Sequence, residues 1–181
     1  MIAERMFLTK GVGIDRKELT SFKKALRNAG ISAFNLVLVS SIYPPHCEYV
    51  LREKGLEYLK PGAIVYCVMS QNATNEPHRL IAASVGLAIP ADKGAHGYIS
   101  EHHCFGQTKF EAGEYAEDLA ASMLASTLGI EFDPERAWNE REQVFKMSGK
   151  IVRTRNATQS AQGNKDGLRT TVVSAAVFVS K

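Results

Sequence analysis

Apolar residues spaced three or four positions apart predict one helix near the start of the chain. Asp15 and Glu18 form a capping-box pattern at its beginning, and Gly30 is placed to end it. The apolar face between them is made by Leu19, Phe22, Leu26 and Ala29. This spacing predicts an amphipathic helix with one buried face.

The same spacing is clearest from about Phe110 to Leu128, and Gly129 follows as the stop of the helix. We therefore expect a second main helix that buries one continuous apolar face. That face is formed by Tyr115, Ala116, Leu119, Ala120, Met123, Leu124, Thr127 and Leu128.

Runs of apolar and β-branched residues predict strands in the rest of the chain. Pro44-Pro45 and the loop compositions of Ser70–Pro77 and Gln159–Gly167 separate these runs. The stretch Arg79–Pro90 is compatible with a helix or a strand, and we favour a strand. The other predicted strands cover about 33–41, 47–52, 63–69, 96–104, 142–156 and 169–179.

These elements amount to six or seven strands and two main helices, with no repeat and no linker. The strands come in runs rather than in strict alternation with helices, which favours a layered α+β fold over a doubly wound sheet. With 181 residues, the chain is expected to form a single domain, 1–181, that buries a sizeable core.

Charge and cysteine usage narrow the possible partners. The chain has 22 Lys and Arg against 19 Asp and Glu, and no basic stripe interleaved with aromatic residues, so no nucleic-acid partner is expected. No apolar run is long enough to span a bilayer, so no membrane partner is expected. Cys47, Cys67 and Cys104 lie in strand-like apolar stretches, which suits reduced thiols in a cytoplasmic protein.

The pair Ser40-Ser41 stands where an apolar run ends and Pro44-Pro45 begins. Hydroxyl groups at strand ends commonly satisfy backbone groups, and this explanation covers most such pairs. A serine peptide bond held in a tight place can also cleave itself and leave an electrophile that no ordinary side chain supplies. The chemistry of the chain depends on whether this pair reacts.

Two other patterns carry less information. Glu101, His102, His103 and Cys104 have metal-ligating side chains, but adjacent residues of a strand point to opposite faces. They cannot bind one ion without partners elsewhere, so no metal is expected. Gly11-Val12-Gly13 lacks the third glycine and the preceding strand of a dinucleotide-binding motif.

The segments around the serine pair resemble the pyruvoyl-dependent arginine decarboxylases of archaea and bacteria. These segments are Asn28–Ile31, Asn35-Leu36 and Val39–Ile42 with Pro44-Pro45. Ala88-Ile89-Pro90 followed by Gly97–Glu101 is similar to the strand that delivers the family's catalytic glutamate. Three further segments resemble the longer bacterial branch of the family: Asn75–Leu80, Glu101-His102-His103 and Thr154–Ser160. The whole match runs from about Thr9 to the C-terminus.

The resemblance implies a self-processed enzyme with an αββα sandwich of mostly antiparallel sheets. Attack of the Ser41 hydroxyl on the Ser40 carbonyl, followed by β-elimination and hydration, would cut the chain into a β chain, 1–40, and an α chain, 41–181. This autocatalytic serinolysis would leave a covalent pyruvoyl group at position 41. That group, rather than pyridoxal phosphate, would form a Schiff base with an amino acid substrate.

The resemblance also implies two further site residues and an assembly. Asn35 matches an asparagine that polarises the Ser40 carbonyl during processing. Glu101 matches the acid that protonates the carbanion left by loss of carbon dioxide, a role that requires a raised pKa. The active sites would lie between neighbouring protomers of a homotrimer or of a dimer of trimers.

Substrate choice is the point at which the chain departs from the family. An acidic residue is expected after Phe22 to hold the positive end of arginine, but Lys23 stands there. A cation repels a guanidinium. Either Lys23 points to solvent and another acid serves, such as Glu18 or one from a neighbouring chain, or the substrate is another amino acid. Decarboxylation of arginine to agmatine is our main hypothesis. The alternatives are an N-terminal-nucleophile amidohydrolase that uses Ser41, and a non-enzymatic oligomeric binding protein.

Overall fold

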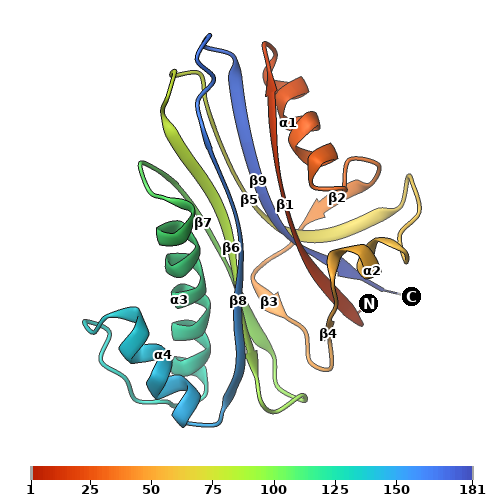
Figure 1. The fold of residues 1–181 in the computed structure, drawn as a ribbon. Helices are drawn as coiled ribbons and strands as arrows, with labels where there is room; N and C mark the ends of the chain where they lie inside the picture. Colours follow the sequence, from red (N-terminus) through yellow and green to blue (C-terminus); the bar gives the residue numbers. More distant parts are fainter. Residues whose placement is uncertain (1, 181) are drawn as a thin grey trace.

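The computed structural model describes residues 2–180, which fold into nine strands and four helices (Figure 1). Met1, the first residue of the predicted β chain, and Lys181, the last residue of the predicted α chain, lie outside the described residues. The strands are β1 Arg5–Asp15, β2 Asn35–Leu38, β3 Ile42–Tyr43, β4 Glu48–Tyr49, β5 Ile64–Thr74, β6 Leu80–Pro90, β7 Gly97–Phe105, β8 Ile151–Gln162 and β9 Arg169–Val179. The helices are α1 Glu18–Asn28, α2 Arg52–Leu56, α3 Lys109–Thr127 and α4 Trp138–Met147.

The strands form two stacked sheets. The five-stranded sheet has the order β2-β5-β9-β1-β4, and the four-stranded sheet has the order β3-β7-β6-β8. Only the pairs β1–β4 and β2–β5 are parallel among the strand pairs of residues 2–180. Helices α1 and α2 cover the outer face of the first sheet, and α3 and α4 cover the second (Figure 1). The predicted α+β class and its αββα layers are confirmed.

Three apolar layers hold the sandwich together. One lies between the two sheets around Val68, Val85 and Ile99, a second lies under α1, and a third lies under α3 and α4. Gly86 of β6 brings α3 close to its sheet, because a Cβ atom there would lie 2.0 Å from the Ala116 carbonyl oxygen. The two sheets are therefore fixed relative to each other and to their helices.

Strand β1 is missing from the predicted elements because two glycines interrupt its apolar pattern. Both glycines are needed for close packing of α1: a Cβ on Gly11 would lie 2.2 Å from the Ala25 carbonyl oxygen, and one on Gly13 would lie 2.1 Å from that of Ser21. Gly11 and Gly13 thus lie inside a strand that pairs with β9 along its whole length.

The predicted capping box at Asp15 is wrong. Asp15 is the last residue of β1, and its carboxylate accepts a hydrogen bond from the Lys17 amide at 3.0 Å and pairs with Lys24 at 2.8 Å. Helix α1 begins at Glu18 without a side-chain cap. A capping box does occur at the start of α3, where Thr108 and Glu111 bond each other's backbone amides.

Several predicted boundaries also change. The strand expected over 142–156 is divided into helix α4, whose Phe145 is buried against Trp138, and strand β8, which begins at Ile151. The segment 47–52 holds only the two residues of β4 before α2 begins. Within 33–41 only four residues form β2, and most of them are exposed rather than buried. The strands expected at 79–90, 96–104 and 169–179 are confirmed.

No helix within residues 2–180 combines the length and the apolar character needed to cross a membrane. The cysteines Cys47, Cys67 and Cys104 are all free thiols.

Candidate active site

The Ser40-Ser41 peptide bond lies where the chain passes from one sheet to the other. The amide of Val39 still donates to the Cys67 carbonyl of β5 at 3.0 Å, in the five-stranded sheet. The carbonyl of Ser41 already accepts from the Ile99 amide of β7 at 2.9 Å, in the four-stranded sheet. Ser40 is the single residue between these two anchors, and it is exposed.

A tight turn surrounds the same bond. The Ile42 amide donates to the Ser40 carbonyl at 2.9 Å, which closes a three-residue turn centred on Ser41. Among residues 2–180, His46 and His78 are the only non-glycine residues with positive φ, so the turn at Ser41 is the relaxed, inverse form. The hydrogen bond withdraws electrons from the carbonyl carbon that the Ser41 hydroxyl is expected to attack.

Glu101 lies on the strand that anchors position 41. Since Ser41 bonds Ile99, and Ile42 pairs with Tyr98, Glu101 is two residues beyond the partner of Ser41. Glu101 is therefore a diagonal neighbour of Ser41, a relation that places two residues on the order of 7 Å apart. Of the three site residues proposed from the sequence, the fold brings Ser41 and Glu101 together but not Asn35.

The surroundings of Glu101 raise the pKa of its carboxyl above the usual value. Burial raises the pKa of the Glu101 carboxyl, and the charge of His103 on the same face of β7 partly opposes that effect. The next residue points the other way: His102 shares a hydrogen bond of 2.9 Å with Gln107 and packs on the Tyr115 ring of α3. Glu101 and His103 thus share one face of β7.

Asn35 lies away from the serine pair of its own chain. Its amide donates to the Ala63 carbonyl and its side chain donates to the Gly62 carbonyl, both just before β5 begins. Val39 bonds β5 four residues further along, which is about 13 Å of strand. The Asn35 side chain therefore does not reach the Ser40 carbonyl within one chain.

Asn35 instead lines a groove of about 960 Å³ on the α1 side of the five-stranded sheet. Its floor and walls are largely apolar and come from α1, β2 and β5. Polar and charged side chains surround these walls, among them Glu18, Lys23, Gln71, His103 and Arg169. Neither Ser41 nor Glu101 lines this groove, although His103 does.

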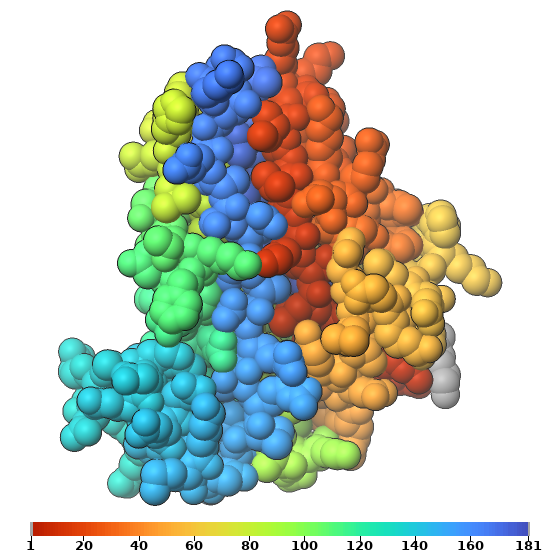
Figure 2. Space-filling model, in the orientation of Figure 1, coloured from red at the N-terminus to blue at the C-terminus, as the bar shows by residue number. Residues whose placement is uncertain are grey.

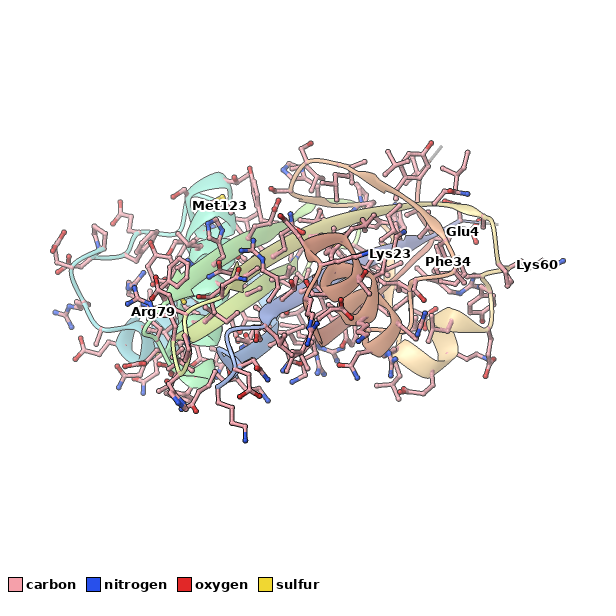
Figure 3. All side chains as sticks on the ribbon, turned by 90° about the horizontal axis from the view of Figure 1, so that it is seen from above. Glu4, Lys23, Phe34, Lys60, Arg79 and Met123 are labelled. Atoms are coloured by element: carbon pink, nitrogen blue, oxygen red, sulfur yellow. The ribbon has the colours of Figure 1, made fainter. Side chains whose placement is uncertain are left out.

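Lys23 lines the groove and is exposed to solvent there. Figure 3 shows Lys23 on the same side of the molecule as Phe34, and both residues line the groove. The ammonium group of the next residue, Lys24, donates hydrogen bonds to the Asp15 carboxylate and to the Ile14 carbonyl. Glu18 is the only carboxylate among the described lining residues, so it is the acid available to balance Lys23.

Arg169 also lines this groove, although no pattern in the sequence predicted it. Its guanidinium donates to the Asn75 side chain at 2.8 Å and lies 3.6 Å from a Glu18 carboxylate oxygen. Its Nε atom is buried without a hydrogen-bond partner, which is costly for a charged donor. No sequence pattern marked Arg169, because it opens a strand whose other residues are apolar or small.

Large apolar side chains are exposed around the crossing from β2 to β3. Leu38 is 62% exposed and Ile64 is 68% exposed, although both lie in strands. The other members of this surface, here called the apolar rim, are Val37, Val39, Ile42 and Tyr66. These side chains lie on both faces of β2 and on its neighbours, and exposed apolar residues at the edge of a sheet can be covered by another protein chain.

Position 41 fits a pyruvoyl group. Removing the bond to Ser40 would leave residue 41 at a chain end, still tied to β7 through its own carbonyl and the Ile99 amide. A titratable acid, Glu101, lies beside it. These residues could therefore hold the group and supply it with a proton.

Comparisons with known proteins agree with this arrangement. The model of the family described as pyruvoyl-dependent arginine decarboxylase matches residues 5–181. A "Probable pyruvoyl-dependent arginine decarboxylase" of Chloroherpeton thalassium is 60% identical over 178 residues, 98% of each chain. "Pyruvoyl-dependent arginine decarboxylase 2" of Methanosarcina mazei is 59% identical over 180 residues, 99% of this chain and 98% of the relative. The chain therefore belongs to the pyruvoyl-dependent arginine decarboxylase family.

Proposed function

We propose that this protein is a cytoplasmic proenzyme that cleaves itself between Ser40 and Ser41 and then decarboxylates L-arginine to agmatine. The family and the names of the relatives support the decarboxylase class and the substrate. One observation carries the proposal for this chain. The scissile bond joins the two sheets at a point where position 41 is tied to β7, with Glu101 two residues along that strand.

Processing begins with the Ser41 hydroxyl, which attacks the Ser40 carbonyl carbon and replaces the amide with an ester. The Ile42 amide already donates to the oxygen on which negative charge develops. β-Elimination then releases the Ser40 carboxylate and leaves dehydroalanine at position 41. Addition of one water and loss of one ammonia yield the ketone, so atoms balance without any other reactant.

In turnover, the pyruvoyl group supplies the electron sink for loss of carbon dioxide, which no ordinary side chain provides. The Ile99 amide donates to the carbonyl oxygen of residue 41 and is placed to stabilise charge that develops there. The Glu101 carboxyl, whose pKa burial raises, holds the proton that replaces the lost carboxylate.

The complete site is proposed to form between neighbouring protomers of a trimer or of a dimer of trimers. Asn35 cannot reach the Ser40 carbonyl of its own chain, whereas the groove that it lines is open. The apolar rim next to Ser40 gives a second protomer a surface to cover. In such an assembly, Asn35 of one chain polarises the Ser40 carbonyl of the next.

The groove is then the place for the substrate side chain. Glu18 is the acid proposed to receive the guanidinium of arginine, since Lys23 occupies the position where an acid was expected. Gln71 adds a polar side chain to the groove, whereas the Asn72 side chain, which also lines it, donates to the Cys104 carbonyl. The apolar floor suits the three methylene groups of arginine.

Carbon dioxide release tests this proposal when it is measured on processed protein with arginine, lysine, ornithine and histidine. We expect self-cleavage during incubation and the highest kcat/KM for arginine. Cleaved protein that prefers another amino acid would retain the decarboxylase class and reject arginine. Uncleaved protein without activity towards any of the four would reject the whole proposal.

A further inference from the structure

A second groove, polar and of about 560 Å³, opens between the free edges of β1 and β8. The sheet orders place it far from the serine pair. The Ser40-Ser41 bond joins β2 to β3, and each of these is the edge strand at one end of its sheet. Strand β8 and the β1–β4 pair lie at the opposite ends of the two sheets. Figure 2 views this side, where the red β1 segment runs between the orange α1–α2 region and blue β8, and green atoms from the α3 region approach it.

Three cations from three different elements line this groove: Lys10 of β1, Arg52 of α2 and Lys109 of α3. Among the ion pairs formed by residues 2–180, none involves Lys10 or Lys109. Arg52 donates to the carbonyls of Ala29 and Asn28, which fixes its guanidinium in place. The nearby Glu117 carboxylate accepts a hydrogen bond from Asn156 at 2.8 Å.

Lys10 and Lys109 lie against each other. Burial, together with a contact to the Lys109 ammonium, lowers the pKa of Lys10 to about 8. Two like charges this close repel each other, although both side chains are exposed and solvent weakens the repulsion. An anion placed between them would remove this cost.

The backbone of β1 adds donors to the groove. The Met6 carbonyl accepts from Val50, and the Val12 amide donates to the Asn28 side chain at 3.0 Å, both on the side of β1 away from β9. Alternate residues of a strand turn their amide groups to the same side. Leu8 and Lys10, between those two, therefore direct their amide N–H groups to the free edge, where the groove lies, together with their carbonyl oxygens.

We propose that this groove binds the phosphate group of a small anion. Phosphate carries about 1.5 to 2 negative charges near neutral pH and three or more acceptor oxygens, so it can offset the charge of two ammonium groups and accept from backbone amides. A simple carboxylate carries one charge. The ligand is inorganic phosphate or a phosphorylated metabolite, and the side chains of Asn156 and Gln159 lie beside the cations to bind the rest of a larger ligand.

Calorimetric titration of the processed protein at constant ionic strength tests the proposal. The ligands are inorganic phosphate, AMP and glucose 6-phosphate, with acetate as the control anion. The variant Lys10→Gln with Lys109→Gln removes two charges from the groove. The matched control, Lys60→Gln with Lys165→Gln, removes two exposed charges elsewhere; Figure 3 shows Lys60 extending away from the body of the protein.

We expect saturable phosphate binding that is at least about tenfold weaker in the groove variant, equivalent to about 1.4 kcal/mol, and little changed in the control. Tighter binding of AMP or glucose 6-phosphate than of phosphate would identify a metabolite as the ligand, and equal binding would identify the phosphate group alone. Absence of saturable binding, equal weakening in both variants, or equally tight binding of acetate would overturn the proposal.

Thermal unfolding provides a second test, which works even if phosphate binding to the Lys10→Gln variant is too weak to measure. Without phosphate, Lys10→Gln removes the repulsion with Lys109 and should raise the melting temperature. With saturating phosphate, the wild type should gain stability and the variant should gain less. A variant that melts lower without phosphate, or that gains as much as the wild type with it, would contradict the proposed site.

Discussion

The backbone carbonyl of Ser41 accepts a hydrogen bond from the Ile99 amide at 2.9 Å, which ties the residue after the scissile bond to β7. Because the carbonyl of residue 41 survives cleavage, this bond can persist from the proenzyme to the processed enzyme. It also sets the relation between position 41 and Glu101. One contact thus links processing of the chain to the later chemistry.

Replacing Ser41 with alanine should abolish cleavage, because no hydroxyl remains to attack the Ser40 carbonyl. Ser40→Ala is the matched control: its carbonyl is retained and its side chain has no part in the reaction, so cleavage should continue. Denaturing gels over a time course measure both variants. Cleavage of Ser41→Ala at the wild-type rate would exclude Ser41 as the nucleophile.

Asn35→Ala should block processing, and a neighbouring chain should be able to rescue it. When Asn35→Ala chains are co-expressed with Ser41→Ala chains, mixed assemblies place an intact Asn35 beside an intact Ser41. We expect the Asn35→Ala chain, marked by a tag, to be cleaved in the mixture and not alone. If no cleavage appears in mixed assemblies, Asn35 does not act between protomers.

Glu101→Gln should leave processing intact and lower kcat by about 10²- to 10⁴-fold, the usual contribution of a positioned general acid. Glutamine keeps the size and hydrogen bonding of the side chain but has no acidic proton. The measurement is agmatine formation by protein that gels show to be fully cleaved. Near-normal turnover would remove Glu101 from the mechanism.

The pH dependence of turnover should shift when His103 is replaced by glutamine. Glu101 acts as an acid, so kcat falls as the pH rises through its pKa, which burial raises above the usual value. The positive charge of protonated His103 lowers that pKa, so His103→Gln should move the alkaline limb of the kcat profile to higher pH. A shift to lower pH, or no shift, would show that another group controls this limb.

Gly86→Ala should lower the free energy of unfolding by about 1–3 kcal/mol, because its Cβ would lie 2.0 Å from the Ala116 carbonyl oxygen and push α3 from its sheet. Gly94→Ala is the control, since the nearest atom to its Cβ is an Asp92 carboxylate oxygen at 3.3 Å, on an exposed side chain rather than on the backbone. Urea unfolding of the two variants compares them. Equal stabilities would mean that α3 can move without cost.

The sequence predicted best where a pattern came from packing. Strand β9 is buried continuously, so its pattern shows in the residues alone. The existence of α3 was predicted correctly, but its face only in part: Ala116, Ala120 and Leu124 are buried, whereas Tyr115 and Met123 are exposed. Strand β5 was predicted to end early because Ser70 and Asn72 are polar. Those side chains instead donate to the His102 and Cys104 carbonyls and connect the two sheets, which no local pattern reveals.

In the candidate site, too, some residues could be predicted from the sequence and others could not. The pair Ser40-Ser41 and Glu101 were identified from motif order, and the register of β3 with β7 brings them together. The groove around Arg169, by contrast, depends on how α1 lies over the five-stranded sheet. The exposure of Leu38 follows from the position of β2 at the edge of its sheet, and neither feature could be predicted from residue spacing.

Intact-mass spectrometry of the fully aged protein tests the central claim most directly. Formation of a ketone at position 41 adds one water and removes one ammonia, so the two fragment masses should sum to nearly the mass of the uncut chain. Fragments whose summed mass exceeds the uncut chain by a whole water would show an ordinary amino-terminal Ser41. That result, or a chain that remains in one piece, would contradict the account.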